Sequence, residues 1–234
     1  MKHFLAFFFG CLLLISSSCS LSCVEGIGEI ETIELDLDVF EGITQESAVP
    51  ITVSFGLNQK VEVEGQRNLI DLLSSEVSGG CWNISFREHV CADDMNIHIT
   101  LPVLNQMNIY GSGDINGTTP FRAEKFELKQ RGSGNVTLDL NSDKLEVDME
   151  GSGEVTLTGL TGDMKIDLEG SGSLEASDLK AMSAKVHSDG SGAVRIYVTE
   201  ELKMDLNGSG NIIYKGNPAD LEMSRSGSGE AKAE

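Results

Sequence analysis

Basic residues and histidines are scarce in this chain of 234 residues. It has 17 Lys and Arg against 37 Asp and Glu, so its formal net charge is −20. Because so acidic a chain repels polyanions, we exclude nucleic acid as a partner and expect no attraction to anionic membranes. The 4 histidines lack ligand-like spacing, so we expect no metal site and no cofactor.

The chain also lacks a hydrophobic run long enough to cross a bilayer as a helix. Its main apolar run has 12 residues, from Phe4 to Ile15, and lies between Lys2 and a Ser-Ser-Ser stretch. This arrangement is typical of a secretory signal peptide, which we place at residues 1–18. No serine lies in a Gly-x-Ser-x-Gly elbow, so a serine nucleophile is unsupported.

Cys19 follows the signal directly, which indicates lipoprotein processing with this cysteine as the acylated first residue. The sequence differs from the usual lipoprotein pattern at one position. That pattern has an aliphatic residue three positions before the cysteine, where this chain has Ser16. Cys23 is a second candidate, and a plain secreted protein is the alternative. A lipid at Cys19 would tether the chain to the membrane through residues 19–30 rather than thread it through the bilayer.

Two further cysteines, Cys81 and Cys91, bracket a short stretch that could form a hairpin. Exported proteins mature in an oxidising compartment, where nearby cysteines pair. We therefore predict a Cys81–Cys91 disulfide, which leaves Cys23 over if it is not acylated.

The most informative feature is a Gly-Ser-Gly triplet that occurs seven times. The intervals between successive triplets are 21, 19, 19, 20, 18 and 19 residues. Such a near-constant period indicates a stacked architecture in which each repeat packs on its neighbours. The triplets start at Gly111, Gly132, Gly151, Gly170, Gly190, Gly208 and Gly227.

Apolar residues alternate with polar ones on both sides of each triplet. Val136, Leu138 and Leu140 follow one triplet, and Leu145 and Val147 precede the next. Period-two alternation predicts strands with one buried face. Each interval therefore contains at least two short strands.

A meander of hairpins and a parallel β-helix both fit this pattern, and we favour the β-helix. In a β-helix equivalent residues of successive coils lie about 4.8 Å apart, so a corner must accommodate its own copy above and below. Glycine reaches unusual backbone angles and serine is small, which suits such a corner. The hypothesis predicts one column of corner serines: Ser112, Ser133, Ser152, Ser171, Ser191, Ser209 and Ser228.

Residues 31–110 lack the triplet but keep the alternation, so we expect irregular first coils or a cap there. Residues 68–77 are the one stretch that resembles a helix. Residues 111–234 form the repeat region, continuous with the preceding one. The predicted fold is all-β: a right-handed parallel β-helix with coils of about 19 residues and an irregular N-terminal β cap.

The triplet sequences resemble a known family. The stretches Gly111-Ser-Gly-Asp-Ile-Asn, Gly132-Ser-Gly-Asn-Val and Gly208-Ser-Gly-Asn-Ile-Ile-Tyr-Lys-Gly-Asn-Pro, with Phe40-Glu-Gly-Ile earlier, are similar to the head GIN domain family of auto-transporter adhesins. The resemblance covers about residues 36–230. It implies a β-helix-like fold and a cell-envelope location, as in lipoproteins of Bacteroidota, and it supplies no catalytic or ligand-binding residues.

Two more specific functions for the triplets, dinucleotide binding and calcium binding, have less support in the sequence. A dinucleotide-binding loop needs a helix after the glycines, whereas here Pro120 follows and the triplet recurs without a helix. A calcium ladder needs a repeated acidic position. The residue after the triplet is instead mixed: Asp114, Asn135, Glu154, Ser173, Ala193, Asn211 and Glu230.

We therefore expect a non-enzymatic outer-membrane lipoprotein, exposed at the surface or in the periplasm, with an adhesive or structural role. It would bind carbohydrate or protein through repeated outward rows: Thr137/Asp139, Thr156/Thr158 and Arg195/Tyr197. The alternative is a polysaccharide-acting β-helix enzyme, which would need a cleft of clustered acidic and basic residues. A third hypothesis is assembly through the exposed end of the stack, and the oligomeric state is left open.

Overall fold

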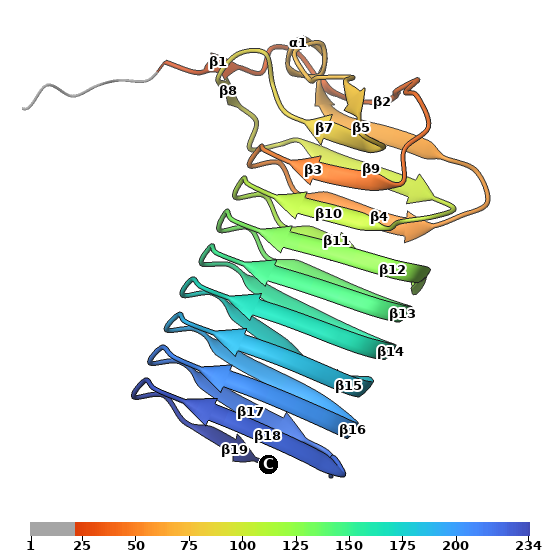
Figure 1. The fold of residues 1–234 in the computed structure, drawn as a ribbon. Coiled ribbons are helices and arrows are strands. Elements are labelled where there is room, and N and C mark those ends of the chain that lie inside the picture. The colour runs from red at the N-terminus through yellow and green to blue at the C-terminus, as the bar shows by residue number, and fades with distance from the viewer. Residues whose placement is uncertain (1–21) are drawn as a thin grey trace, which may run out of the picture.

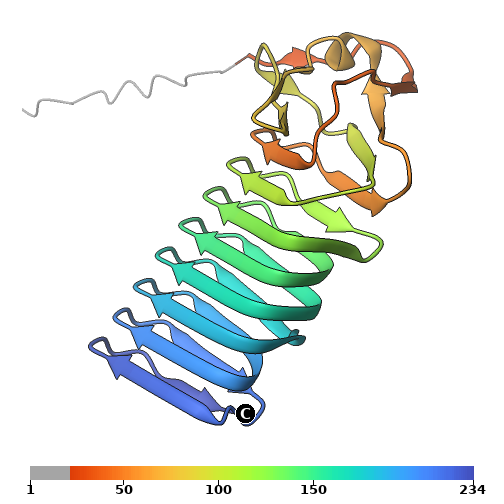
Figure 2. The ribbon, with the colours of Figure 1, turned by 45° about the vertical axis from the view of Figure 1, so that its right-hand side comes forward.

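The computed structural model describes residues 22–234, so the expected signal peptide and Cys19 lie outside the described residues. These residues form an elongated stack of coils below an irregular N-terminal cap, as Figures 1 and 2 show from two directions. The stack confirms the expected parallel β-helix. Among the described residues the one helix is α1 (Arg67–Ile70) in the cap, and it is too short to cross a membrane.

The strands of residues 22–234 lie in two sheets. A two-stranded sheet joins β1 (Val24–Glu25) to β8 (Val90–Cys91). All other strands belong to one continuous 17-stranded sheet. They are β2 (Ile30–Glu34), β3 (Gly42–Gln45), β4 (Ile51–Phe55), β5 (Lys60–Gln66), β6 (Val77–Ser78), β7 (Cys81–Ile84), β9 (Asn96–Leu101), β10 (Gln106–Ile109), β11 (Ile115–Gly117), β12 (Phe121–Gln130), β13 (Val136–Met149), β14 (Glu154–Leu168), β15 (Ser173–Ser188), β16 (Ala193–Leu206), β17 (Asn211–Lys215), β18 (Asp220–Arg225) and β19 (Ala231–Ala233).

Successive coils pair in parallel and in the register that the triplets predict. Val136 pairs with Val155, and Val155 pairs with Leu174. Strands β13 to β16 each bend through a corner, so each contributes to both faces of its coil. Every coil therefore has two corners: the triplet corner, and a second corner at the opposite edge near residues 141–143, 160–162, 180–182 and 199.

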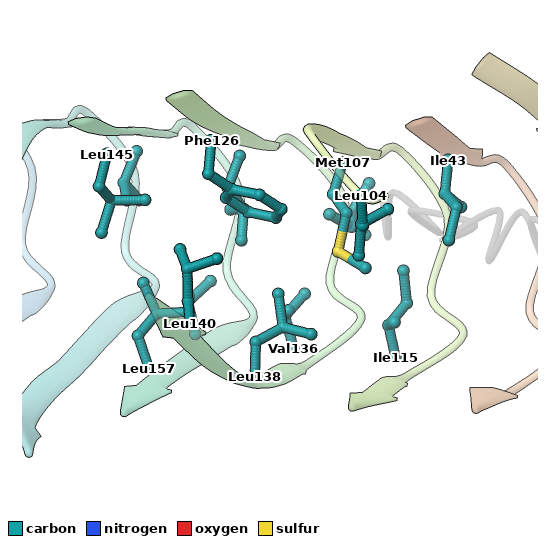
Figure 3. Close-up of a cluster of buried hydrophobic side chains, with 14 of the residues drawn as sticks. Ile43, Leu104, Met107, Ile115, Phe126, Val136, Leu138, Leu140, Leu145 and Leu157 are labelled. Carbon is teal, nitrogen blue, oxygen red and sulfur yellow. The ribbon is translucent and has the colours of Figure 1, made fainter. Parts of the chain in front are cut away.

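The core is a set of stacked apolar columns between the two faces of the solenoid. One column follows the first inward position after each triplet and is fully buried, in agreement with the alternation. Figure 3 shows part of this interior, with Ile115, Val136 and Leu157 pointing inward. The column consists of Ile115, Val136, Val155, Leu174, Val194 and Ile212.

The glycines are needed at the triplet corner because successive backbones approach closely. A Cβ on Gly192 would overlap the carbonyl oxygen of Gly172, and the same holds at Gly210 and Gly229 against the coil above. No glycine of a described triplet has a positive φ, so the expected role for unusual backbone angles is wrong. Backbone bonds cross the stack instead, such as the one from the Ser133 N–H to the Gly111 oxygen at 3.2 Å.

In the cap, the strands do not stack in chain order, and some of them pair antiparallel. The coil formed by β3 and β4 lies inside the stack, between β10 and β11 on one side and β7 and β9, which come later in the chain, on the other. Antiparallel strands β5 and β2 then continue the sheet outward from β9. The predicted helix over residues 68–77 is only four residues long, because Leu73 forms a bridge to Phe86 and Val77 begins β6.

Candidate functional site

An open groove runs along the second corners of the coils. It has a volume of about 830 Å³ and crosses five successive coils. Its lining combines apolar, hydroxyl, amide and charged side chains. The lining residues are Arg122, Ala123, Glu124, Asn141, Ser142, Asp143, Leu160, Thr161, Gly162, Lys180, Ala181, Met182 and Thr199.

Two large apolar side chains give the groove its exposed hydrophobic surface. Leu160 is 57% exposed and Met182 is 52% exposed, although most apolar side chains of these coils are buried. Both lie at corners, where the strand alternation is interrupted. Exposed apolar surface in a groove with a polar rim is typical of a binding site.

Hydroxyl groups line the groove beside these apolar side chains. Thr161 is only 5% exposed, and its Oγ1 lies 2.9 Å from the Ser142 Oγ of the coil above. The Thr199 hydroxyl donates to the Ala181 carbonyl at 3.1 Å. These bonds fix the hydroxyls between successive coils.

Charges of both signs lie at the rim. Arg122 and Lys180 are cationic, and Glu124 and Asp143 are acidic. The Lys180 ammonium lies 5.9 Å from the centre of the Tyr197 ring, within the range of a cation–π contact. Among residues 22–234, no group of three or more His, Cys, Asp or Glu side chains could hold a metal ion. The arrangement suits non-covalent binding.

Between residues 154 and 206, the changes in coil length lie at the second corners and in the strand residues that lead into them. The pairing register shifts between Thr156 and Thr158, and again between Ala176 and Lys180 and between Ala181 and Ser183. The triplet corners stay aligned throughout. Because the fold constrains the second corner less, its side chains are free to serve a ligand.

The expected outward rows lie mainly on a flat face. Thr137, Thr156, Glu175 and Arg195 form one column, in which Arg195 lies 3.6 Å from Glu175. In the parallel row, Asp139 pairs with Thr158. Tyr197 alone adjoins the groove, through Lys180.

The corner serines lie on the exposed side of the stack. The middle serine of every triplet is exposed, the first glycine is mostly half-buried and the last is buried. No hydrogen bond joins one of these serine hydroxyls to another in the described part of the chain. The seven are Ser112, Ser133, Ser152, Ser171, Ser191, Ser209 and Ser228, and we assign them no ligand.

The position after the triplet has a structural role where it is Asp or Asn. The Asp114 Oδ1 accepts from the Asn135 N–H at 2.8 Å, and the Asn135 Oδ1 accepts from the Glu154 N–H at 2.9 Å. The Asn211 Oδ1 does the same for Glu230 at 3.0 Å. These three oxygens link successive coils, so their role at these positions needs no calcium ion.

The predicted Cys81–Cys91 disulfide is wrong. Cys91 is bonded to Cys23, with 5.4 Å between their Cα atoms, and Cys81 is a buried free thiol. The reason is topological: Cys81 begins β7 and packs under β3, whereas Cys91 lies in β8, which pairs with β1. Burial raises the pKa of the Cys81 thiol, while a hydrogen bond with Thr44 acts in the opposite direction.

Ion pairs cover the face next to the groove. The Lys125 ammonium lies 2.6 Å from Glu127 Oε1 and 3.0 Å from Glu146 Oε2. These hydrogen bonds raise the pKa of Lys125, and the bond from Lys125 lowers the pKa of Glu127. Lys165 with Asp167 and Lys203 with Glu201 repeat the arrangement, with the pKa of both lysines raised by those bonds. All are about one-third exposed or more, so their contribution to stability is small.

The fold is a repeat-built β-solenoid with an open groove along its second corners. The chain belongs to the family described as "putative auto-transporter adhesin, head GIN domain", whose sequence profile matches residues 39–218. This membership places it among adhesin-like proteins of the cell envelope or surface.

Solved structures of Bacteroidales proteins show the same fold. A putative adhesin from Bacteroides fragilis is 25% identical, with a TM-score of 0.86, over 90% of this chain and all of that one. A putative lipid binding protein from Parabacteroides distasonis is 24% identical, with a TM-score of 0.76, over 91% of this chain and all of that one. A putative adhesin from the same organism is 22% identical, with a TM-score of 0.71 and the same coverage. No curated protein matches the chain.

Proposed function

We propose that the protein is a non-enzymatic, lipid-anchored adhesin that binds an extended neutral polysaccharide along the second-corner groove. The family supports an adhesive role, and it gives no support to the alternative of a polysaccharide-acting enzyme. The observation that carries the proposal is a groove that crosses five coils and combines exposed Leu160 and Met182 with hydroxyl and amide groups.

A sugar chain fits this lining. Sugars present apolar C–H faces and many hydroxyls, which match the apolar and hydroxyl side chains of the groove. The net charge of −20 opposes a polyanionic ligand, so we favour a neutral polymer. Five coils span four strand spacings of about 4.8 Å, so a groove of roughly 19 Å accommodates an oligosaccharide of several sugars.

The test is a glycan array followed by titration of the polysaccharide that binds. The double variant Leu160→Asp/Met182→Asp should weaken binding at least about tenfold, because charged groups replace apolar contacts. Leu57→Asp is the matched control, since Leu57 is 85% exposed and lies in the cap away from the groove. Equal losses in both variants, or no bound glycan, would contradict the proposal.

For the anchor, we propose acylation of Cys19, with residence in the outer membrane. Cys23 is engaged with Cys91, which supports Cys19 over Cys23 as the lipid acceptor. Metabolic labelling with a palmitate analogue should mark the wild-type protein and fail with Cys19→Ala. Label retained in Cys19→Ala would count against this site.

A further inference from the structure

The first described residues are fastened to the cap at several points. Cys23 is bonded to Cys91, and the Val24 N–H donates to the His89 carbonyl at 2.8 Å. Strands β1 and β8 then pair Val24 with Val90 and Glu25 with Cys91. Residues 23–25 of the expected tether over residues 19–30 are therefore attached to the cap.

Asn68 of α1 holds Glu25 and Ile27 with both ends of its side-chain amide. Its Nδ2 donates to the Glu25 carbonyl at 2.9 Å, and its Oδ1 accepts from the Ile27 N–H at 2.8 Å. Gly26 lies so close to the Gln66 side chain that a Cβ there would overlap it. Residues 23–27 are therefore a clamped segment, held by a disulfide, a short ladder and an asparagine.

This clamp sets how far the cap can lie from a lipid at Cys19. Cys23 lies four positions after Cys19, and an extended chain of that length reaches at most about 14 Å. Without the clamp, the first firm attachment would be β2, which begins at Ile30. The same tether would then have 11 residues and reach roughly 38 Å.

We propose that the cap is the membrane-facing end of the molecule and that the clamped segment holds it there, so that the solenoid and its groove project away from the bilayer. This inference rests on the proposed anchor at Cys19 and adds the orientation. The partner surface is a lipid bilayer without net charge, because Glu25, Glu29 and Glu31 beside the clamp would be repelled by anionic lipid.

Ile27 fits this placement. Its side chain is 75% exposed, although its backbone is fixed by Asn68. Gly28 follows with a φ of 96°, a conformation that favours glycine and turns the chain toward β2. An apolar side chain held outward beside the anchor can enter the headgroup region.

Energy transfer from tryptophan to labelled lipid tests the orientation. Trp82, the one tryptophan of the chain, is buried in β7 at the cap. Tyr214 in β17 is near the opposite end, about seven strand spacings or roughly 34 Å further along the stack. The full lipidated protein is placed on phosphatidylcholine vesicles that contain a dansyl-labelled headgroup lipid.

We expect transfer from Trp82 to exceed transfer from a Trp82→Phe/Tyr214→Trp protein roughly threefold or more, because of that separation. Breaking the clamp with Cys23→Ser/Cys91→Ser/Asn68→Ala should reduce transfer from Trp82. Cys81→Ala is the matched control, because Cys81 lies in the cap outside the clamp, and it should leave transfer unchanged. If Trp82→Phe prevents folding, the single variant Tyr214→Trp replaces it. The added tryptophan at position 214 should then contribute emission that is not transferred to the labelled lipid.

The possible outcomes separate a failure of the Cys19 anchor from a failure of the proposed orientation. A wild-type protein that does not bind the vesicles overturns the Cys19 anchor and the orientation together. A protein that binds but shows equal transfer from both ends overturns the orientation alone. Transfer that is unchanged in the clamp-breaking variant shows that the clamp does not hold the cap at the membrane.

Discussion

The two corners of each coil solve different problems. At the triplet corner, backbones approach so closely that glycine is required on both sides of the serine. At the second corner, strands bend with changing length and sequence, and two large apolar side chains are exposed. One edge of the solenoid therefore maintains the stack, and the other is free to bind a ligand.

Replacing Gly192 at the triplet corner should cause the largest loss of stability. A Cβ at this position meets the Gly172 carbonyl, so Gly192→Ala must separate two coils and should cost about 3 kcal/mol or more of unfolding free energy. Ser191→Ala, one residue earlier and exposed, should change stability by less than about 0.5 kcal/mol. Denaturant unfolding measures both, and similar losses in the two variants would refute the close-packing explanation.

The second-largest difference between the two corners should come from inserting a single glycine at each. Between Ser191 and Gly192 it disrupts the aligned backbone bonds, and we expect a loss of about 2 kcal/mol. Between Met182 and Ser183 it lengthens a corner that already varies, and we expect less than about 1 kcal/mol. Thermal unfolding of the two insertions gives the comparison. Greater damage from the second insertion would mean that the corners were assigned the wrong roles.

Ser188 offers a gain in stability just before a triplet corner. It is 1% exposed, and its Oγ has no hydrogen-bond partner in the described chain, between Leu168 and Leu206 of the neighbouring coils. Ser188→Ala removes the unpaired hydroxyl and should stabilise the protein by about 1 kcal/mol. A decrease in the denaturation midpoint would indicate a partner for this hydroxyl.

The smallest effect concerns Lys125 and Glu127 next to the second corner. Because the folded pKa of Glu127 is lowered, its contribution is present above the ordinary glutamate pKa and is lost as pH falls through the folded value. A double-mutant cycle of Lys125→Met and Glu127→Gln should show a small coupling at pH 7. Coupling that persists unchanged in acid would contradict the ion pair.

The coils could be predicted from the sequence because their information is local. Alternation gave the inward columns, and the triplet interval gave the register. The sequence could not show which property makes glycine necessary at the triplet corner. A close approach between coils and a positive φ both require glycine, so the two causes give the same sequence. The Asp114 and Asn135 links depend on the stack and became visible only with it.

The cap could not be predicted in the same way. Its stacking order departs from chain order, and the Cys23–Cys91 bond joins residues 68 positions apart, so the shorter Cys81–Cys91 spacing was misleading. The groove did leave a signal. Leu160 and Met182 interrupt the alternation near the middle of their triplet intervals, and large apolar residues at such places indicate exposed surface.

Cross-linking of corner serines tests the stacked register most directly. Adjacent coils place Ser152 and Ser171 about 4.8 Å apart, within the Cα range of a disulfide, whereas Ser133 and Ser171 are separated by two spacings, about 9.6 Å. The stack predicts that Ser152→Cys/Ser171→Cys closes an intramolecular disulfide under mild oxidation and that Ser133→Cys/Ser171→Cys does not. Cross-linking of both pairs, or of neither, would contradict a single column of coils in triplet register.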